Sequence, residues 1–525
     1  MSSNYKILTV LVALLMWGVA TFSQANGYPN LIQISGGLIS GTSSQDGQVH
    51  IYKGIPFAAP PIAGLRWREP QPVQPWTGVR KCINFGPSPM QAKPTPFAVY
   101  TSEFLIPASP ISEDCLYLNV WTAAKGPNER RPVIVWIYGG GFTSGGSGVP
   151  IYDGQEMAKK GIVFVSINYR VGIFGFFALP ELTKESDHRA SGNYGLMDQI
   201  AALKWVKDNI ESFGGDPENV TVAGQSAGSI SVNCLVASPM CRGLFKRAIA
   251  ESGAAFLNGM ISTPSLTKAE EAGEEFAHSL NVQKISDLRA VSAEDLMKKN
   301  YPLRGVIVDG YVLPDKIAHI FATGSQNDVG VITGWNGDDG FLFGKVKNAD
   351  EFRSDATRQY DSQAGQYLEY FPSSTDQQAA GSQLKLSRDL LFGIQNYTWA
   401  LVQSEKSKSK IYVYNFNRKV PATPEYEKYG AFHTGEVAYA YDNLSFENRP
   451  WRKVDFDLAN LMSTYWANFA KTGDPNGSGL PYWPPFDTKS FQTMQFDSTS
   501  TIEALPSKAE LDFLISRIKI DQELK

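Results

Sequence analysis

Five short, strongly apolar runs constrain the fold of this chain more than any other feature of its sequence. They are Val133–Tyr138, Val163–Asn168, Val220–Ala223, Val329–Thr333 and Ile411–Asn415. Each has the length and the β-branched or aromatic content of a strand that is buried on both faces. Helical patterns separate the runs, and in the clearest one apolar residues recur at steps of three and four from Leu196 to Ile210. This alternation predicts an α/β fold, with a mostly parallel central sheet that carries helices on both faces.

The charge balance and the lack of internal boundaries limit what the chain can be. Lys and Arg total 48 against 52 Asp and Glu, which gives a net charge of −4. Without a basic excess to bind phosphates, we expect no nucleic-acid partner. No repeat, charge block or linker divides residues 26–525, so we expect one large domain with long insertions. The sequence indicates no oligomeric state.

The first 25 residues are typical of a secretory signal peptide. Lys6 precedes the apolar run Ile7–Phe22, and Ser23 and Ala25 supply small residues for a cut after Ala25. An uncleaved anchor is the alternative, but a run of this length spans only about 24 Å of a hydrocarbon core that is about 30 Å thick. We therefore expect a secreted or periplasmic protein. No later segment is apolar for long enough to cross a membrane, so we expect no membrane span in the mature chain.

Export would permit disulfides among the four cysteines. Cys82 and Cys115 bracket a stretch rich in Pro, Ser and Phe, and a bridge between them would close that loop. Cys234 and Cys241 flank a possible helix end. These two could pair there, or Cys234 could be a buried thiol.

A candidate nucleophile follows the third apolar run. Residues 224–228 read Gly-Gln-Ser226-Ala-Gly, and a helix-compatible segment comes next. A strand, then G-x-S-x-G, then a helix is the setting of a nucleophile elbow, where the turn is so sharp that glycine is needed two residues before and two after the serine. The pentapeptide alone is a weak signal, since chance gives on the order of 0.3 matches in a chain of this length. Its setting makes Ser226 a candidate.

A run of glycines, Gly139 to Gly141, follows the strand at 133–138. Glycines expose backbone N–H groups with no side chain in the way, as stabilising the negative oxygen of a tetrahedral intermediate requires. Such a loop could instead hold phosphate, but neither the P-loop pattern nor the dinucleotide fingerprint is present. The loop precedes Ser226 by a strand and a helix, as in lipases and esterases, where the N–H after the serine is a further donor. That N–H belongs to Ala227 here.

Three histidines follow Ser226, and one of them suits a general base. His278 and His319 lie in helical segments, where we expect them to be ordinary helix residues. His433 lies in a glycine-flanked loop after the strand at 411–415, where a base can reach a serine on a neighbouring turn. A loop histidine is commonly just solvated, but elimination favours His433.

Two adjacent aspartates are candidates for the acid that would orient this histidine. Asp338 and Asp339 follow the strand at 329–333. A carboxylate at the end of a strand can accept the imidazole N–H and fix its tautomer. Two adjacent acids are also common in solvated turns, and the sequence physics does not choose between them.

Together these motifs resemble the type-B carboxylesterase/lipase family. This is the branch of the α/β-hydrolase fold that contains carboxylesterases, cholinesterases and the catalytically silent neuroligins. The resemblance covers nearly all of the mature chain and is carried by Tyr52–Phe57, Leu65–Trp67, Ser112–Asn119, Trp136–Phe142, Asn168–Arg170, Gly192–Leu196, Phe213–Pro217, Gly224–Gly228 and Thr472–Asn476. It implies an α/β-hydrolase fold and a serine carboxylesterase that acts on a small-molecule ester without metal or organic cofactor.

The resemblance also implies roles for individual residues. Ser226 is expected to be the nucleophile and His433 the base. Asp339 is expected to be the acid, because the family's acid directly precedes the glycine that is Gly340 here. The remaining matches are Gly140, Gly141 and Ala227 as oxyanion donors, Cys82 and Cys115 as the first disulfide, and Glu436 as a carboxylate behind the histidine.

Departures from the family pattern narrow the expected substrate. The usual acid is Glu rather than Asp339, and Gln225 replaces the Glu common beside the cholinesterase serine. The loop from Cys82 to Cys115 contains no Trp, which cholinesterases use to bind a quaternary ammonium by cation–π attraction. We therefore expect uncharged carboxylic esters. The alternatives are an amide, thioester or polyester substrate, or a non-catalytic recognition module like the neuroligins.

Two segments, Pro87–Pro110 and Leu257–Leu303, are expected to shape the substrate pocket. Four aromatic residues are candidates for its lining, although ordinary packing is the more common role for each. They are Phe97, Tyr100, Phe104 and Phe256.

Overall fold

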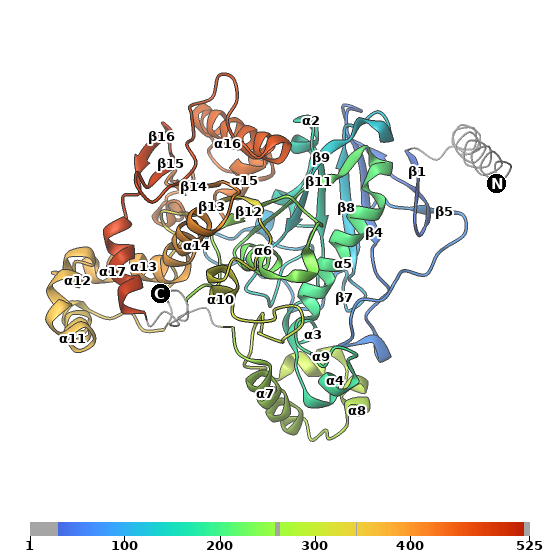
Figure 1. The fold of residues 1–525 in the computed structure, drawn as a ribbon, viewed down its shortest axis with the longest axis horizontal. Helices are drawn as coiled ribbons and strands as arrows, with labels where there is room; N and C mark the ends of the chain where they lie inside the picture. The colour runs from blue at the N-terminus through green and yellow to red at the C-terminus, as the bar shows by residue number, and fades with distance from the viewer. Residues whose placement is uncertain (1–29, 258–262, 343, 519–525) are drawn as a thin grey trace.

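An eleven-stranded sheet forms the centre of the molecule in the computed structural model, which describes residues 30–257, 263–342 and 344–518 (Figure 1). From one edge to the other the strands are β16 (Thr501–Ala504), β15 (Gln492–Phe496), β14 (Ile411–Phe416), β13 (Gly330–Asn336), β12 (Arg247–Glu251), β11 (Gly215–Gln225), β9 (Arg131–Ile137), β10 (Val163–Ile167), β8 (Tyr117–Thr122), β4 (His50–Pro56) and β3 (Thr42–Ser43). The strands from β15 to β10 run parallel, and antiparallel strands complete both edges.

The five predicted apolar runs are all strands of this sheet, and they account for β9, β10, β11, β13 and β14. The run Arg247–Glu251, which forms β12 between β11 and β13, was not predicted. Two small sheets lie outside the central one: β1 (Leu31–Ile34) with β2 (Gly37–Ser40) and β5 (Val79–Lys81), and β6 (Ser88–Pro89) with β7 (Ile111–Ser112).

Helices surround the sheet (Figure 1). They are α2 (Gln155–Lys159), α3 (Gly172–Phe176), α4 (Pro180–Glu185), α5 (Tyr194–Asn209), α6 (Ala227–Ala237), α7 (Leu266–Ser279), α8 (Ile285–Ala290), α9 (Ala293–Lys298), α10 (Ile317–Ala322), α11 (Ala349–Tyr360), α12 (Ala364–Tyr370), α13 (Asp376–Arg388), α14 (Ile394–Lys406), α15 (Val437–Ala440), α16 (Lys453–Thr472) and α17 (Lys508–Arg517). The predicted helix at 196–210 is α5, one residue from the expected end. The α/β fold class is therefore confirmed.

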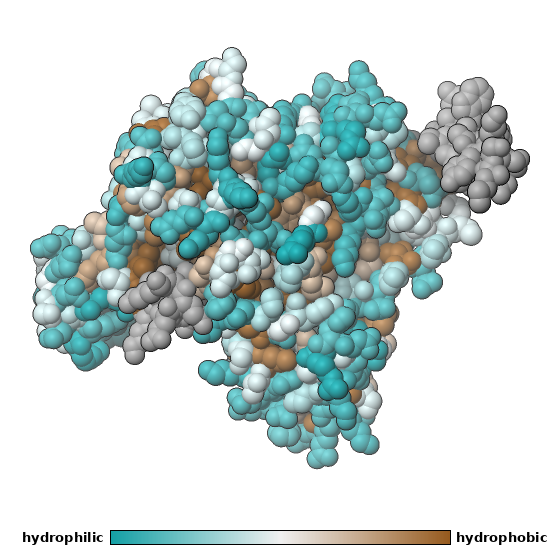
Figure 2. Space-filling model, viewed as in Figure 1, coloured by the Kyte–Doolittle hydropathy of each residue, from teal (hydrophilic) through white to brown (hydrophobic). Residues whose placement is uncertain are grey.

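Insertions extend the molecule beyond the sheet, as predicted. Helices α7, α8 and α9 gather with α4 at one end, and α11 and α12 form a second projection (Figure 1). Hydrophilic residues cover most of the face shown in Figure 2, with apolar side chains visible between them. Among the described residues, no helix combines the length and the hydropathy that crossing a bilayer requires. The predicted signal peptide lies outside the described residues.

The cysteines correct one prediction. All four are buried and carry free thiols, so the expected bridge between Cys82 and Cys115 is not formed. Cys82 is held between strands, where its N–H donates to Ser40 O at 2.7 Å and its carbonyl accepts from Lys53 N at 2.8 Å. Cys115 instead lines a small internal pocket together with Met90.

The second cysteine pair is also unbonded. Cys234 lies inside α6 and Cys241 in the short helical turn after it, and both are fully buried. This arrangement agrees with the buried-thiol alternative for Cys234.

Candidate active site

Ser226 lies at the turn between β11 and α6, and its backbone is strained. Its φ of 58° and ψ of −124° place a non-glycine residue in a region that L-residues avoid. The Ser226 N–H donates to Glu251 O at 2.8 Å, which ties the turn to the end of β12. The strand, turn and helix predicted around the G-x-S-x-G motif are all present.

The glycines on either side of the serine are needed for close packing. A Cβ at Gly228 would lie 2.0 Å from Ile137 O, and a Cβ at Gly224 would lie 2.6 Å from the Gly228 carbonyl carbon. Both contacts are far inside van der Waals range and involve backbone atoms, which cannot rotate away. The elbow therefore brings the start of α6 against the end of β9, where the glycine loop begins.

Substituting Gly228→Ala should separate α6 from β9 and destabilise the enzyme by about 3 kcal/mol. The added methyl group would overlap backbone atoms, which cannot move aside without shifting the helix or the strand. We expect a Tm lower by several degrees in thermal unfolding and a reduced kcat for a chromogenic ester. Gly381→Ala is the matched control, since a Cβ there meets nothing within 4 Å and the residue lies in α13. An equal Tm for the two variants would contradict this account.

The glycine loop approaches the serine directly. A Cβ at Gly139 would lie 2.8 Å from the Cβ of Ser226, so only glycine allows this approach. Gly140 and Gly141 adopt φ values of +104° and +62°. Within the described part of the chain, the N–H groups of Gly140, Gly141 and Ala227 donate no hydrogen bond. Three donors are thus available beside one hydroxyl.

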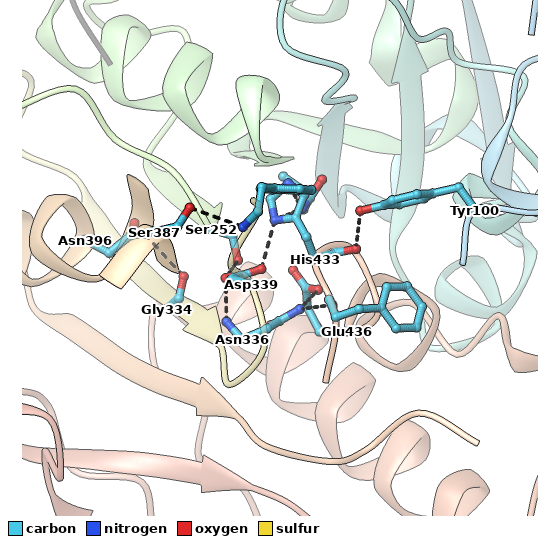
Figure 3. A network of polar contacts seen from close by, with 12 residues as sticks. Tyr100, Ser252, Gly334, Asn336, Asp339, Ser387, Asn396, His433 and Glu436 are labelled. Carbon is cyan, nitrogen blue, oxygen red and sulfur yellow. Dashed lines mark hydrogen bonds and ion pairs between the residues drawn. The ribbon is translucent and has the colours of Figure 1, made fainter. Parts of the chain in front are cut away.

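His433 and Asp339 meet across the ends of β14 and β13 (Figure 3). His433 Nδ1–H donates to Asp339 Oδ1 at 2.8 Å. Asp339 is fully buried, and its Oδ2 accepts from Ser252 Oγ at 2.8 Å and from Asn336 N at 2.7 Å. The carboxylate is therefore held in place by two further donors while it faces the imidazole.

The neighbouring acid has a different position. Asp338 is exposed, and its Oδ2 accepts from Ala431 N at 2.8 Å. It thus binds the backbone of the loop that carries the histidine, not the ring. The structure distinguishes two acids that the residue pattern did not.

Aromatic rings and backbone contacts fix the position of the histidine. Phe392 stacks on the His433 ring with centroids 4.7 Å apart, and Phe341 contacts it edge-on at 5.2 Å. Tyr100 OH donates to the His433 carbonyl at 2.8 Å (Figure 3). These contacts restrict the ring to the plane in which Nδ1 meets Asp339.

The Gln225 side chain lies beside the other ring nitrogen. Its Nε2 lies 3.1 Å from His433 Nε2. Among the described residues, Ser226 Oγ has no hydrogen-bond partner, so the serine–histidine contact is not made in this arrangement. Such contacts are commonly loose without substrate and tighten when it binds. Reorientation of the Gln225 amide would free Nε2 for the neighbouring hydroxyl.

Two buried carboxyl groups lie behind the histidine. Asn336 Nδ2 donates to Glu436, the predicted carboxylate (Figure 3). Burial, followed by the charges of Asp339 and Glu251, raises the pKa of Glu436 well above its ordinary value. Burial likewise raises the pKa of Glu251 to about 8, although Trp466 Nε1 and Tyr441 OH donate to its Oε1 at 2.8 and 3.0 Å. Both shifts favour the neutral form of the carboxyl group.

Sequence reasoning missed Glu251, although a signal was available. An acidic residue at the end of the apolar run Arg247–Glu251 is unusual, because a buried charge is costly. Its backbone carbonyl holds Ser226 N, as described above. This contact makes it part of the support of the elbow.

The serine and the histidine line one pocket of about 530 Å³. The glycine loop forms part of its wall, and most of the remainder is apolar, including Leu105, Ile106, Val149 and Phe341. Phe97, Tyr100 and Phe104 line it, as the predicted segment 87–110 requires. Phe256 does not, since it packs against Phe321 and Trp399, and the segment 257–303 contributes no lining residue among those described.

Comparison with known proteins agrees with this geometry. The profile of the Carboxylesterase family matches residues 29–514. The chain is 36% identical over 483 residues to the fumonisin B1 esterase of Sphingopyxis macrogoltabida, covering 86% of this chain and 84% of that one. It is 34% identical to the para-nitrobenzyl esterase of Bacillus subtilis (strain 168), covering 90% and 95%. With the cocaine esterase of Homo sapiens the identity is 33%, covering 87% and 85%. The chain belongs to the carboxylesterase family and is a serine hydrolase that acts on carboxylic ester bonds.

Proposed function

We propose that this esterase is exported and hydrolyses small, uncharged carboxylic esters through an acyl-enzyme on Ser226. The observation that carries the proposal is the single pocket walled by Ser226, His433, Gly140 and Gly141, with the histidine bound to Asp339 at 2.8 Å. A hydroxyl, a base and unpaired amide donors around one cavity are the groups that acyl transfer needs.

In the acylation step, His433 Nε2 takes the proton of Ser226 Oγ while that oxygen attacks the ester carbonyl carbon. The Asp339 carboxylate keeps the other ring nitrogen protonated and stabilises the imidazolium that forms. His433 then gives its proton to the departing alcohol as the carbon–oxygen bond breaks, and the acyl group remains on Ser226.

The carbonyl oxygen becomes negative in this step, and Gly140, Gly141 and Ala227 are proposed to stabilise it through their N–H groups. Each such donor typically contributes 10²–10³ in turnover. In deacylation, His433 removes a proton from water, the hydroxide attacks the acyl carbon, and Ser226 recovers its proton as the acid leaves. The serine hydroxyl and the neutral histidine of the free enzyme are then restored.

The apolar lining supports an uncharged substrate. Phe97, Tyr100 and Phe104 face a cavity whose only Lys, Arg, Asp or Glu among the described lining residues is Lys93. The names of the three relatives refer to different compounds, so the comparisons support ester hydrolysis more than any one ester. Amide, thioester and polyester bonds share the same chemistry and belong in the substrate panel.

Covalent labelling tests the proposal. A fluorophosphonate should attach to Ser226 and block ester hydrolysis with the same time course, because the reagent imitates the tetrahedral intermediate. Peptide mass spectrometry identifies the labelled residue. A panel of esters that vary in acyl and alcohol length, with one amide and one thioester, then ranks kcat/KM. Failure of the active enzyme to label, or labelling at another serine, would contradict the assignment.

The export part of the proposal rests on Lys6, the apolar run Ile7–Phe22 and the small residues up to Ala25. When the full chain is produced in a secreting host, the mature protein should begin at Asn26. Intact mass measurement of the exported fraction checks this cleavage.

A further inference from the structure

A second cavity lies at the end of the parallel strands opposite to the catalytic pocket. It is a groove of about 680 Å³ at the amino ends of β12, β13 and β14. Ser226, Asp339 and His433 all follow the carboxyl ends of parallel strands. Because β12 has five residues and rises by about 3.3 Å per residue, the groove and the pocket are separated by the length of the strands, about 16 Å.

Cations concentrate in this groove although the whole chain has a net charge of −4. Five basic side chains line it, and Asp328 is the only acidic one among the described lining residues. The five are Arg242, Lys246, Arg247, Lys408 and Lys410. In the described part of the chain none of the five forms an ion pair, and Asp328 already accepts from Ser407 Oγ and, at 3.1 Å, from Ser409 N. The lining therefore carries an excess of positive charge, with five basic side chains against the single carboxylate of Asp328, while Glu218 outside the lining interacts with Lys246.

The backbone places the cations on both sides of the groove. Lys246 O accepts from Gly330 N at 3.3 Å, and Lys410 O accepts from Val331 N at 3.0 Å, so β13 runs between the two lysines. Neighbouring strands are about 4.8 Å apart, which puts the two lysine backbones roughly 10 Å from each other. That span suits a ligand with more than one anionic group.

Arg247 is held by neutral partners only. Its Nη1 donates to Asn219 Oδ1 and, at 3.0 Å, to Ala470 O, while its Nε lies close against Gly473, where a Cβ would approach it to 3.1 Å. Half-burial without a counter-charge lowers the pKa of Arg247 from its ordinary value. An anion in the groove would supply the missing charge.

We propose that this groove is a binding site for a phosphate-bearing polyanion such as a diphosphate group. Lysines and arginines on two sides, together with an arginine that has unused donors, match the several oxygens and the high charge density of linked phosphates. A single carboxylate would leave most of the cations uncompensated. The phosphate groups could belong to a free solute or to a lipid headgroup, which the experiment separates.

Calorimetric titration of the full chain with pyrophosphate tests the proposal, against chloride at matched ionic strength. Lys246→Gln/Lys410→Gln removes two exposed cations from the groove and leaves Arg247 and its partners in place. Each lost charge-assisted contact should weaken pyrophosphate binding about tenfold, or about 100-fold for the pair. The esterase activity of this variant should be unchanged, because both lysines lie at the amino ends of the strands, away from the catalytic pocket at their carboxyl ends.

Lys298→Gln/Lys453→Gln is the matched control. It removes the same net charge from two exposed, ion-paired lysines on α9 and at the far end of α16. We expect it to bind pyrophosphate like the unaltered enzyme. Equal weakening by both double variants would overturn the assignment. Failure of the unaltered enzyme to bind pyrophosphate would also overturn it, unless the enzyme binds anionic vesicles through the groove.

Sedimentation with phosphatidylglycerol vesicles, against phosphatidylcholine vesicles, identifies the source of the phosphate. Binding that is lost only in the groove variant supports a headgroup ligand, even where free pyrophosphate gives no heat. Absence of binding in both assays contradicts the proposal. Neither outcome bears on the proposed acyl-enzyme, which is read out separately by labelling of Ser226.

Discussion

Ser226→Ala should reduce kcat for a chromogenic short-chain ester by about 10⁴- to 10⁶-fold, because no other group can form the acyl-enzyme. The residual rate would come from the amide donors and from substrate binding alone. The substitution removes one oxygen that has no hydrogen-bond partner among the described residues, so the fold should persist. It also replaces serine by another L-residue at φ 58°, so the strain of the turn is unchanged. Initial rates at saturating ester, with circular dichroism and thermal unfolding, measure both expectations.

The control for this substitution is Ser286→Ala. Ser286 is exposed on α8, in an insertion that contributes nothing to the described pocket lining. It should keep full activity and an unchanged Tm. If Ser226→Ala retained more than a few per cent of the activity, the nucleophile would have to be another residue.

Asp339→Asn should lower kcat by about 10⁴-fold, while Asp338→Asn should stay within a few-fold of the unaltered enzyme. An asparagine at 339 cannot stabilise the imidazolium and can donate to the ring, which favours the wrong tautomer. Its Oδ1 can still accept from Ser252 and Asn336, so the loss is expected in turnover rather than in folding. Asp338 binds Ala431 N and has no contact with the imidazole, so its variant is a matched control one residue away.

The two variants are compared by kcat, KM and Tm under the same conditions. A large fall in kcat for Asp338→Asn with little change for Asp339→Asn would reverse the assignment. Asp339→Glu adds one methylene to a fully buried site, so we expect it to lose stability even though it restores the family's usual acid.

Much of the site could be predicted because its signals are local. The elbow needs a strand, two glycines and a helix within a dozen residues, and Gly224, Ser226 and Gly228 satisfy it by steric exclusion alone. The glycine loop after β9 is local in the same way. The choice of His433 followed from chain order and from the small number of histidines.

The failures concern contacts between distant segments. The Cys82–Cys115 bridge was predicted from the loop that these residues bracket and from the family resemblance, but both carry free thiols, and the backbone of Cys82 is bonded to Ser40 and Lys53. The segment 257–303 was expected to shape the substrate pocket, and its described residues contribute nothing to the lining. Composition and spacing do not show which residues from distant segments of the chain come into contact.

The amino-acid sequence by itself determined the parallel strands, the sharp turn at Ser226 and the amide loop beside it, because short-range sterics and burial leave few alternatives there. Tertiary structure alone decided which aspartate faces His433 and that Gln225 approaches the same ring. It also decided that five cations converge at the amino ends of β12, β13 and β14. These outcomes depend on the register of neighbouring strands and on the direction in which each loop leaves them. Both are set by packing across the whole sheet rather than by any short stretch of residues.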